Sequence, residues 1–202
     1  MEKTRIAVLV SGGGTNLEAL LCAKENGKIP HGDICLVVSS KQGVFALERA
    51  KNHNVKSVVI EQKDKELFEN ELISTLQNEK IDLVVLAGFL KILTERFTKL
   101  YSNRIINVHP SLIPSFCGKG FYGLTVHEKA LDYGVKVTGA TVHFVNEIPD
   151  GGKIILQKSV NVCKNDTPEK LQKRVMKQAE WVILPKAVEL VSKNLTKEKN
   201  KK

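Results

Sequence analysis

Short apolar segments rich in β-branched residues alternate with helix-like segments along this chain, and this alternation constrains the fold most. Strands are expected at Ile6–Val10, Ile34–Ser39, Ser57–Ile60, Leu83–Ala87, Ile105–Val108, Thr138–Val145 and Ile154–Val162. Helices are expected at Asn16–Asn26, Val44–Asn52, Lys65–Asn78, Thr94–Tyr101 and Val126–Tyr133, followed by a last helix from Thr167-Pro168 to about Val191. Strands that alternate with helices form a parallel sheet covered on both faces. We therefore expect a single-domain α/β fold with a mostly parallel, twisted sheet and helices on both faces, in the Rossmann-like manner.

The length and charge of the chain fit this expectation. Its 202 residues, 42% of them hydrophobic, are enough for one domain. The formal net charge is +9, and residues 186–202 alone hold six lysines and two glutamates. We expect residues 1–192 to form the domain and residues 193–202 to be a disordered, lysine-rich tail.

The basic charge of the chain raises the question whether it binds nucleic acid. Its cysteines indicate the redox state of the compartment in which it works. Aromatic residues make up only 5% of the chain and do not interleave with arginine, so we expect no nucleic-acid partner. The four scattered cysteines form no Cys-x-x-Cys pair, which predicts a reducing cytoplasm and no metal site. No apolar run is long enough to span a bilayer, and Ile6–Val10 is too short for a signal-peptide core, so we expect no membrane association.

Polar residues close one of the expected buried strands. Side chains alternate between the faces of a strand, so Asn107 and His109 lie on the same face at the end of Ile105–Val108. An amide donor beside a titratable imidazole suits chemistry at a carbonyl group, because one polarises the oxygen while the other handles a proton. Taken alone, the pattern is also typical of a polar strand end closed by a proline turn.

A glycine-rich segment, Ser11–Asn16, follows the first strand and opens a helix. Glycines let backbone N–H groups approach an anion, and a helix N-terminus favours negative charge. The segment lacks the Gly-Lys-Ser/Thr of a P-loop. Leu17 replaces the third glycine of a dinucleotide fingerprint, and the second strand ends in Ser39-Ser40 without an acid for a ribose. A single phosphate is therefore favoured over a dinucleotide, with a plain tight turn as the alternative.

Five segments together resemble one family. They are Ser11–Asn16, Leu86–Leu93, Asn107–Leu112 (Asn-x-His-Pro-Ser-Leu), Val142–Val145 and Asp150-Gly151-Gly152. Over roughly residues 5 to 185, the chain resembles the folate-dependent phosphoribosylglycinamide formyltransferase family. The resemblance implies transfer of the formyl group of 10-formyltetrahydrofolate to the amine of glycinamide ribonucleotide in purine synthesis. It also implies a cytoplasmic monomer or homodimer with small-molecule substrates and no metal.

The resemblance assigns roles to individual positions. The expected catalytic residues are Asn107, His109 and Asp150. The expected ribonucleotide-binding residues are Gly13, Gly14, Thr15, Asn16, Gly88, Pro110 and Glu180. The expected folate-binding residues are Lys65, Phe89, Leu90, Lys91, Ile92, Leu93 and Asn107. Many relatives carry arginine where Lys65 and Lys91 stand, and lysine lacks the bidentate fork that grips a carboxylate.

Several of these positions also have a purely structural interpretation. Asp150 before two glycines is typical of a turn, Lys65 of a solvated helix residue, and His143 of a structural histidine inside a strand. The glycines of Cys117–Leu124 flank Phe121-Tyr122 and predict a lid, with a rigid surface loop as the alternative.

Three other functions are alternatives for the whole chain. A formyltetrahydrofolate hydrolase shares the Asn, His and Asp but normally adds an N-terminal regulatory domain, for which we expect no room. A methionyl-tRNA formyltransferase normally adds a C-terminal RNA-binding domain, whereas only the lysine-rich segment follows Pro185. A nucleic-acid-binding module is a different class, and steep loss of binding with salt would reveal it.

Overall fold

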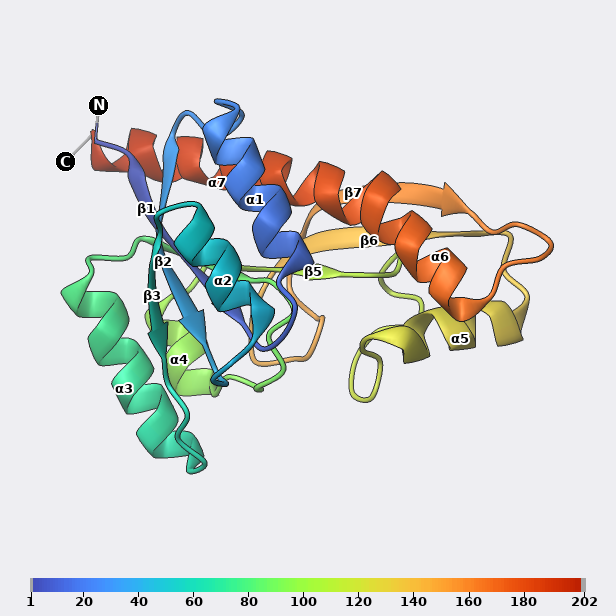
Figure 1. The fold of residues 1–202 in the computed structure, drawn as a ribbon, viewed down its shortest axis with the longest axis horizontal. Helices are drawn as coiled ribbons and strands as arrows, with labels where there is room; N and C mark the ends of the chain where they lie inside the picture. Colours follow the sequence, from blue (N-terminus) through green and yellow to red (C-terminus); the bar gives the residue numbers. More distant parts are fainter. Residues whose placement is uncertain (1, 201–202) are drawn as a thin grey trace.

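A seven-stranded sheet forms the centre of the protein, which is known from a computed structural model that describes residues 2–200. The strand order is β3-β2-β1-β4-β5-β6-β7 (Figure 1). The strands are β1 (Thr4–Val10), β2 (Gly32–Ser39), β3 (Lys56–Val59), β4 (Leu83–Leu86), β5 (Ile105–His109), β6 (Val137–Phe144) and β7 (Ile154–Asn161). The first five run parallel, and β6 and β7 are antiparallel to their neighbours. The expected single-domain, mostly parallel α/β fold is confirmed.

Helices cover both faces of this sheet. They are α1 (Thr15–Glu25), α2 (Phe45–Asn52), α3 (Lys65–Asn78), α4 (Glu95–Leu100), α5 (Leu124–Tyr133), α6 (Pro168–Val175) and α7 (Trp181–Lys199). Residues of α1, α2, α6 and α7 share one buried apolar cluster with the sheet, and residues of α3 and α4 share the other. The β-branched, fully apolar sequence of the inner strands follows from this burial on both faces.

The order in which the chain adds strands to the sheet reverses between β1 and β4, although these two strands run parallel. The chain first runs outward through β2 and β3, and then returns to place β4 on the other side of β1. Ligands of open α/β sheets bind beyond the carboxyl ends of the strands at such a switch point. The glycine-rich segment after β1, the segment after β4 and the polar end of β5 all lie at this edge.

The C-terminal region differs from the expectation in two ways. A π-helical turn, η1 (Met176–Glu180), separates α6 from α7. The expected disordered tail, 193–202, is helical through Lys199, and 201–202 lie outside the described residues. Thr196 is buried with its hydroxyl 3.1 Å from that of Thr4, and Lys199 donates to Asp82 at 2.7 Å. These contacts bind the last turns of α7 to the start of β1 and to the residue before β4. They continue the helix past Val191, where its apolar spacing had predicted the end.

The remaining elements begin and end within two residues of their expected positions. Within residues 2–200, no helix combines the length and the hydropathy that a bilayer span requires.

Candidate active site

The polar end of β5 lies against the antiparallel strand β6. In the register of the two strands, Asn107 pairs with His143, and His109 pairs with Thr141. His109 and His143 are both almost completely buried. The Nδ2 atom of Asn107 lies 3.2 Å from Nε2 of His143. The antiparallel pairing therefore adds a second histidine to the two polar residues that strand alternation had predicted.

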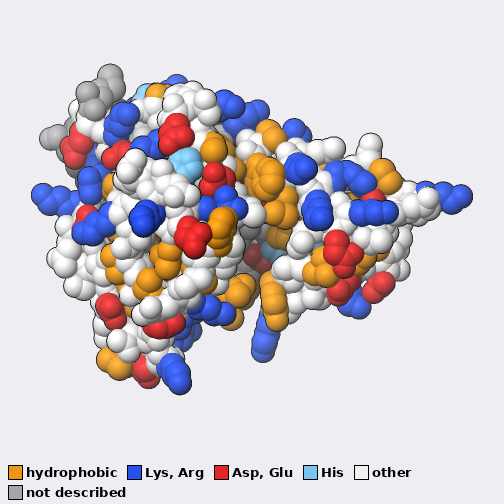
Figure 2. All heavy atoms as spheres, in the orientation of Figure 1, with side chains coloured by type: hydrophobic (Ala, Val, Ile, Leu, Met, Phe, Trp, Pro, Cys, Tyr) orange, Lys and Arg blue, Asp and Glu red, His pale blue; other side chains and the backbone are white. Residues whose placement is uncertain are grey.

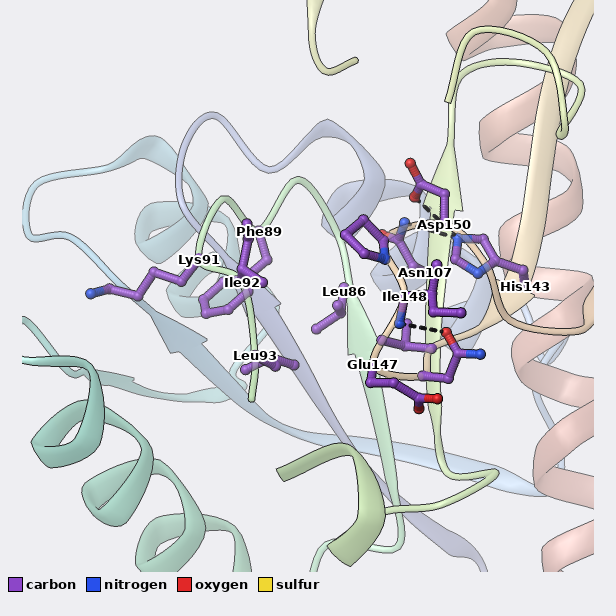
Figure 3. A pocket seen from close by; sticks show the side chains of 13 residues that line it. Leu86, Phe89, Lys91, Ile92, Leu93, Asn107, His143, Glu147, Ile148 and Asp150 are labelled. Atoms are coloured by element: carbon purple, nitrogen blue, oxygen red, sulfur yellow. Dashed lines mark hydrogen bonds and ion pairs between the residues drawn. The ribbon is translucent and has the colours of Figure 1, made fainter. Parts of the chain in front are cut away.

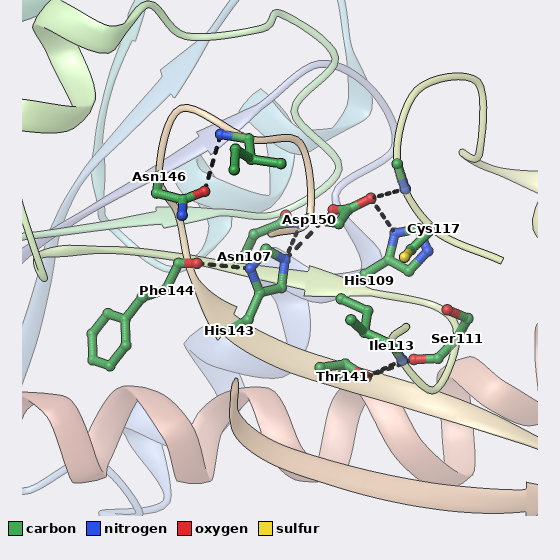
Figure 4. Close-up of polar contacts among 12 residues, drawn as sticks. Asn107, His109, Ser111, Ile113, Cys117, Thr141, His143, Phe144, Asn146 and Asp150 are labelled. Atoms are coloured by element: carbon green, nitrogen blue, oxygen red, sulfur yellow. Dashed lines mark hydrogen bonds and ion pairs between the residues drawn. The ribbon is translucent and has the colours of Figure 1, made fainter. Parts of the chain in front are cut away.

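Asp150 joins the two histidines (Figure 4). One carboxylate oxygen lies 3.5 Å from Nδ1 of His109, and the other lies 3.5 Å from Nε2 of His143. The backbone N–H of Gly118 donates to Asp150 at 2.8 Å. The turn that carries Asp150 needs its glycine sequence, because a Cβ atom on Gly152 would lie 1.7 Å from the carbonyl oxygen of Phe144. The Asp-Gly-Gly motif is a turn, and this turn delivers the carboxylate to the site.

The surroundings of Asp150 keep it ionised. Burial by itself would raise the pKa of Asp150, but contact with His143, the charge of His109 and the Gly118 N–H together hold this pKa below its ordinary value. The site therefore presents an ionised carboxylate to both imidazole rings.

The other nitrogen of His109 is occupied by the following loop. Its Nε2 lies 2.9 Å from the carbonyl oxygen of Phe116. A carbonyl oxygen only accepts hydrogen bonds, so Nε2 carries a proton and donates it there. The backbone of Phe116, immediately before the expected lid Cys117–Leu124, is therefore held at the site, as is Gly118 within the lid.

A third histidine, His127 of α5, lies near His109. It is fully buried, and neither ring nitrogen has a hydrogen-bond partner among the described residues. Burial, together with the charge of His109, lowers the pKa of His127 to about 4. His127 is therefore a neutral ring at neutral pH, and its sequence position near a helix end had given no sign of this location.

The glycine-rich segment meets the C-terminal helices through one hydrogen bond. Nδ2 of Asn16 donates to Oε2 of Glu180 at 2.7 Å, although 164 residues separate them. Gly14 has a left-handed backbone (φ 71°), and the structure shows no side-chain cap on α1 among the described residues. Thr15 and Asn16 form the first turn of α1. The uncapped N–H groups of this turn are available to an anion.

Glu180 lies in the π-helical turn and is only 6% exposed. Burial raises the pKa of Glu180, although the hydrogen bond from Asn16 acts in the opposite direction. Gly88 follows β4 with a left-handed backbone, and Pro110 follows β5 directly. The expected ribonucleotide-binding residues thus come from the loop after β1, the first turn of α1, the segments after β4 and β5, and η1.

An apolar pocket adjoins Asn107 and Asp150 (Figure 3). Phe89, Ile92 and Leu93 line one side of it. The other side is formed by the segment between β6 and β7. The full lining is Leu86, Phe89, Lys91, Ile92, Leu93, Asn107, His143, Val145, Asn146, Glu147, Ile148, Pro149 and Asp150. Ile92 is 66% exposed and Ile148 is 58% exposed, so apolar surface is available to a ligand here.

Two expected folate residues are absent from this lining. Lys65, the first residue of α3, is exposed outside the pocket, and Leu90 contributes a backbone N–H bonded to the Ser11 hydroxyl at 3.0 Å. Lys91 extends away from Asn107, and its Nζ reaches the carbonyl oxygen of Gln62 at 3.0 Å (Figure 3).

Sequence reasoning missed the pocket wall formed by residues 145–149 and the participation of His143. Residues 146–149 lie between the expected strand Thr138–Val145 and Asp150. Their polar and proline-containing sequence gives no signal of its own; only the Asp150 that ends the segment marked it as functional.

The charge on the visible face does not form a single basic patch. Figure 2 shows Lys and Arg side chains spread among acidic ones, with hydrophobic side chains gathered around a hollow in the middle of the face. This distribution differs from the continuous basic stripe typical of nucleic-acid binders.

Comparison with known proteins shows the family of the chain. The family described as formyl transferase matches residues 4–188. The chain is 38% identical over 179 residues to the chloroplastic phosphoribosylglycinamide formyltransferase of Arabidopsis thaliana, covering 87% of this chain and 61% of the relative. It is 42% identical over 195 residues to the trifunctional purine biosynthetic protein adenosine-3 of Bos taurus, covering 95% of this chain and 18% of the relative. The chain thus spans less than two thirds of these curated relatives.

Solved structures extend the similarity to the fold. Glycinamide ribonucleotide transformylase 1 from Symbiobacterium toebii superposes with a TM-score of 0.88 at 38% identity, covering 96% of this chain and 89% of that one. Phosphoribosylglycinamide formyltransferase from Anaplasma phagocytophilum gives a TM-score of 0.86 at 38% identity, covering 95% and 88%.

Proposed function

Because the chain belongs to the formyl transferase family, we propose that it transfers the formyl group of 10-formyltetrahydrofolate to the amine of glycinamide ribonucleotide. The products are formyl-glycinamide ribonucleotide and tetrahydrofolate, in purine synthesis. The observation that carries the proposal is the position of Asn107, His109 and Asp150 beside an apolar pocket, at the sheet edge where the glycine-rich segment also lies.

The apolar pocket suits the folate. A formyl transferase requires a formyl donor linked to folate, whose flat ring system needs apolar walls and a few polar contacts. Phe89, Ile92 and Ile148 supply apolar side chains, and Asn107 and Asp150 supply polar atoms. In the proposal, the formyl carbon lies next to Asn107.

The glycine-rich segment suits the ribonucleotide. The uncapped N–H groups at the start of α1 bind the phosphate, and the segment follows β1, which is separated from β5 only by β4, so the amine is directed toward His109. Glu180, held by Asn16, accepts hydrogen bonds from hydroxyl groups of the sugar.

The chemistry is a direct displacement. The amine nitrogen attacks the formyl carbon, a new C–N bond forms, and the bond from that carbon to N10 of the folate breaks. The Asn107 amide and protonated His109 donate hydrogen bonds to the oxyanion of the tetrahedral intermediate. The proton lost by the amine reaches N10 by way of a water held by Asp150, so no net proton is gained or lost.

Neighbouring nucleophiles are poorly prepared for a covalent route. The Ser111 hydroxyl donates to the carbonyl oxygen of Ser115, and burial, reinforced by the charge of Asp150, raises the pKa of the Cys117 thiol. Both observations favour direct transfer over a formyl-enzyme.

The proposed setting is the cytoplasm. All four cysteines are free thiols, as expected in a reducing compartment. The proposed partners are the two small-molecule substrates, bound by a monomer or a homodimer without nucleic acid or membrane.

One assay tests this function. The protein is mixed with 10-formyltetrahydrofolate, with and without glycinamide ribonucleotide, and the release of tetrahydrofolate is followed together with formate. We expect rapid release only with the ribonucleotide and no formate. Rapid formate release without the amine would make the protein a hydrolase and overturn the proposal.

A further inference from the structure

A cluster of three metal-ligating side chains lies outside the candidate active site. Glu18 and Cys22 are one turn apart on α1, and His53 caps the C-terminal end of α2. One carboxylate oxygen, the thiol sulfur and an imidazole nitrogen of these residues all lie within 4.8 Å of one another. The two helices pack side by side on the face turned toward the viewer in Figure 1. We propose that Glu18, Cys22 and His53 form a binding site for Zn²⁺ that joins α1 to α2.

The separations fit a tetrahedral metal site. Bonds of about 2.0 Å from zinc to oxygen or nitrogen and about 2.3 Å to sulfur, at tetrahedral angles, put ligand atoms roughly 3.3 to 3.5 Å apart. Oε1 of Glu18 lies 3.3 Å from Nε2 of His53 and 3.9 Å from Sγ of Cys22. The thiol sulfur and an imidazole nitrogen lie within 4.8 Å of each other. Side-chain rotations that shorten this separation and the one between Glu18 and Cys22 would complete three coordination positions, and water would take the fourth.

The partners of the histidine match those of a metal ligand. While Nε2 of His53 faces Glu18, its Nδ1 lies 2.6 Å from a carboxylate oxygen of Glu25. Metal-binding histidines commonly donate their second N–H to a carboxylate, which fixes the tautomer and orients the ring. Glu25 supplies this carboxylate, so His53 is already turned to present Nε2 to a metal.

Arg49 orients the carboxylate ligand in the same way. Its guanidinium pairs with Oε2 of Glu18 at 2.8 Å and leaves Oε1 turned toward His53 and Cys22. Arg49 also donates to the carbonyl oxygen of Gly13 at 2.9 Å. The metal would thus stiffen the helix pair that supports the glycine-rich segment.

The charges of the cluster suit a divalent cation. Zn²⁺ is neutralised by the Glu18 carboxylate and the Cys22 thiolate, while Arg49 and Glu25 balance each other. Burial and the charges of Glu18 and Glu25 raise the pKa of Cys22. Burial alone would lower the pKa of His53, but hydrogen bonds to Glu25 and Glu18 raise it. Metal binding must therefore displace two protons to solvent, one from the thiol and one from Nε2 of His53. A set of one sulfur, one nitrogen and one oxygen is typical of zinc and excludes a preference for Mg²⁺ or Ca²⁺.

Co²⁺, which replaces Zn²⁺ and absorbs light, is the probe for the test. The full-length protein is titrated with CoCl₂ in a non-thiol reductant, and the thiolate-to-cobalt charge-transfer band is recorded. We expect one Co²⁺ per chain and displacement by Zn²⁺. Cys22→Ser should abolish the band, whereas Cys163→Ser and Cys117→Ser, which alter thiols outside the cluster, should retain it. Absence of the band in the wild type, or its persistence in Cys22→Ser, would overturn the proposal.

Two further variants separate the histidine from its orienting carboxylate. His53→Gln should weaken Co²⁺ binding at least as much as Glu25→Gln, for which we expect a loss of about tenfold, as is typical when an outer partner is removed. Zn²⁺ should raise the unfolding temperature of the wild type but not of Cys22→Ser. Each variant is first shown to keep the wild-type circular dichroism spectrum without metal. Unchanged affinity in His53→Gln would remove the histidine from the site and contradict the proposal.

Discussion

Asn107 and His143 face each other across two antiparallel strands, with the amide nitrogen of Asn107 3.2 Å from Nε2 of His143. Nδ1 of His143 lies 2.8 Å from the carbonyl oxygen of Phe144 and therefore carries a proton. When His143 is neutral, its Nε2 accepts a hydrogen bond from Asn107 and fixes the orientation of the amide. His143 is consequently a positioning residue for Asn107, although its place inside a strand favoured a purely structural interpretation.

The first prediction tests this role. His143→Gln should lower kcat about tenfold, because the Asn107 amide loses its orientation toward the oxyanion, while KM for the ribonucleotide stays close to the wild-type value. Steady-state kinetics with both substrates provide the measurement. A rise in KM with unchanged kcat would instead mark His143 as a binding or packing residue.

The second prediction concerns Asp150 and His109. Asp150→Asn should lower kcat by about 100-fold with little change in either KM, because the carboxylate acts mainly in the transition state. His109→Ala should be at least as damaging, since it removes the cation that faces the oxyanion. The double variant should fall little below the worse single variant, because the two residues act as a unit. Fully multiplicative losses would show that they act independently.

The third prediction separates two glycines of the glycine-rich segment, which we propose binds the phosphate. A Cβ atom on Gly14 would lie 2.7 Å from Cβ of Ala46 in α2, at a left-handed φ of 71°, whereas a Cβ on Gly13 meets no atom within 4 Å. Gly14→Val should therefore reduce the free energy of unfolding by about 1–3 kcal/mol. Gly13→Val should keep wild-type stability and raise KM for the ribonucleotide about tenfold, through lost hydrogen bonds to the phosphate. Denaturant unfolding measures the stability of both variants, and steady-state kinetics measure KM for both substrates. If Gly13→Val raised KM for the folate equally, the assignment of this segment to the phosphate would be contradicted.

The fourth prediction concerns the pH dependence of stability at Glu180. Burial raises the pKa of Glu180 in the folded protein above its unfolded value. As the pH rises above the unfolded pKa, the unfolded chain releases this proton before the folded chain does, so stability falls until the folded pKa is passed. Glu180→Gln removes this loss. The variant should be more stable than the wild type at neutral pH and similar to it near about pH 4.

The effect of the same variant on substrate binding serves as a control. Glu180→Gln should raise KM for the ribonucleotide and leave KM for the folate unchanged, because the glutamine loses the charge that strengthens hydrogen bonds to the sugar. A variant that is less stable than the wild type at neutral pH would show that the charged carboxylate stabilises the fold.

The sequence predicted the residues that local periodicity or a motif controls. Alternation along a strand placed Asn107 and His109 together, and the glycine pattern located the start of α1 correctly. The strand register that brings His143 to Asn107 is a long-range property, which neither residue encodes locally. The same is true of the contacts from Thr196 and Lys199 to Thr4 and Asp82, which make residues 193–199 helical despite their lysine-rich composition.

The fifth prediction concerns Cys117–Leu124, the expected lid. Its two anchors in the structure are the Gly118 N–H on Asp150 and, immediately before it, the Phe116 carbonyl oxygen on Nε2 of His109. The second anchor occupies the imidazole N–H that must face the substrate in the proposed mechanism, so the loop has to release it before reaction. Amide hydrogens of 117–124 should therefore exchange fast in the free protein and slowly with the ribonucleotide and a non-reactive folate analogue both bound. Residues 70–78 of α3 provide the internal reference, because Leu72, Ile73 and Leu76 are buried in the apolar cluster that α3 and α4 share with the sheet. Identical exchange of 117–124 in both states would show a rigid loop, and His109 would then have to act through its other nitrogen.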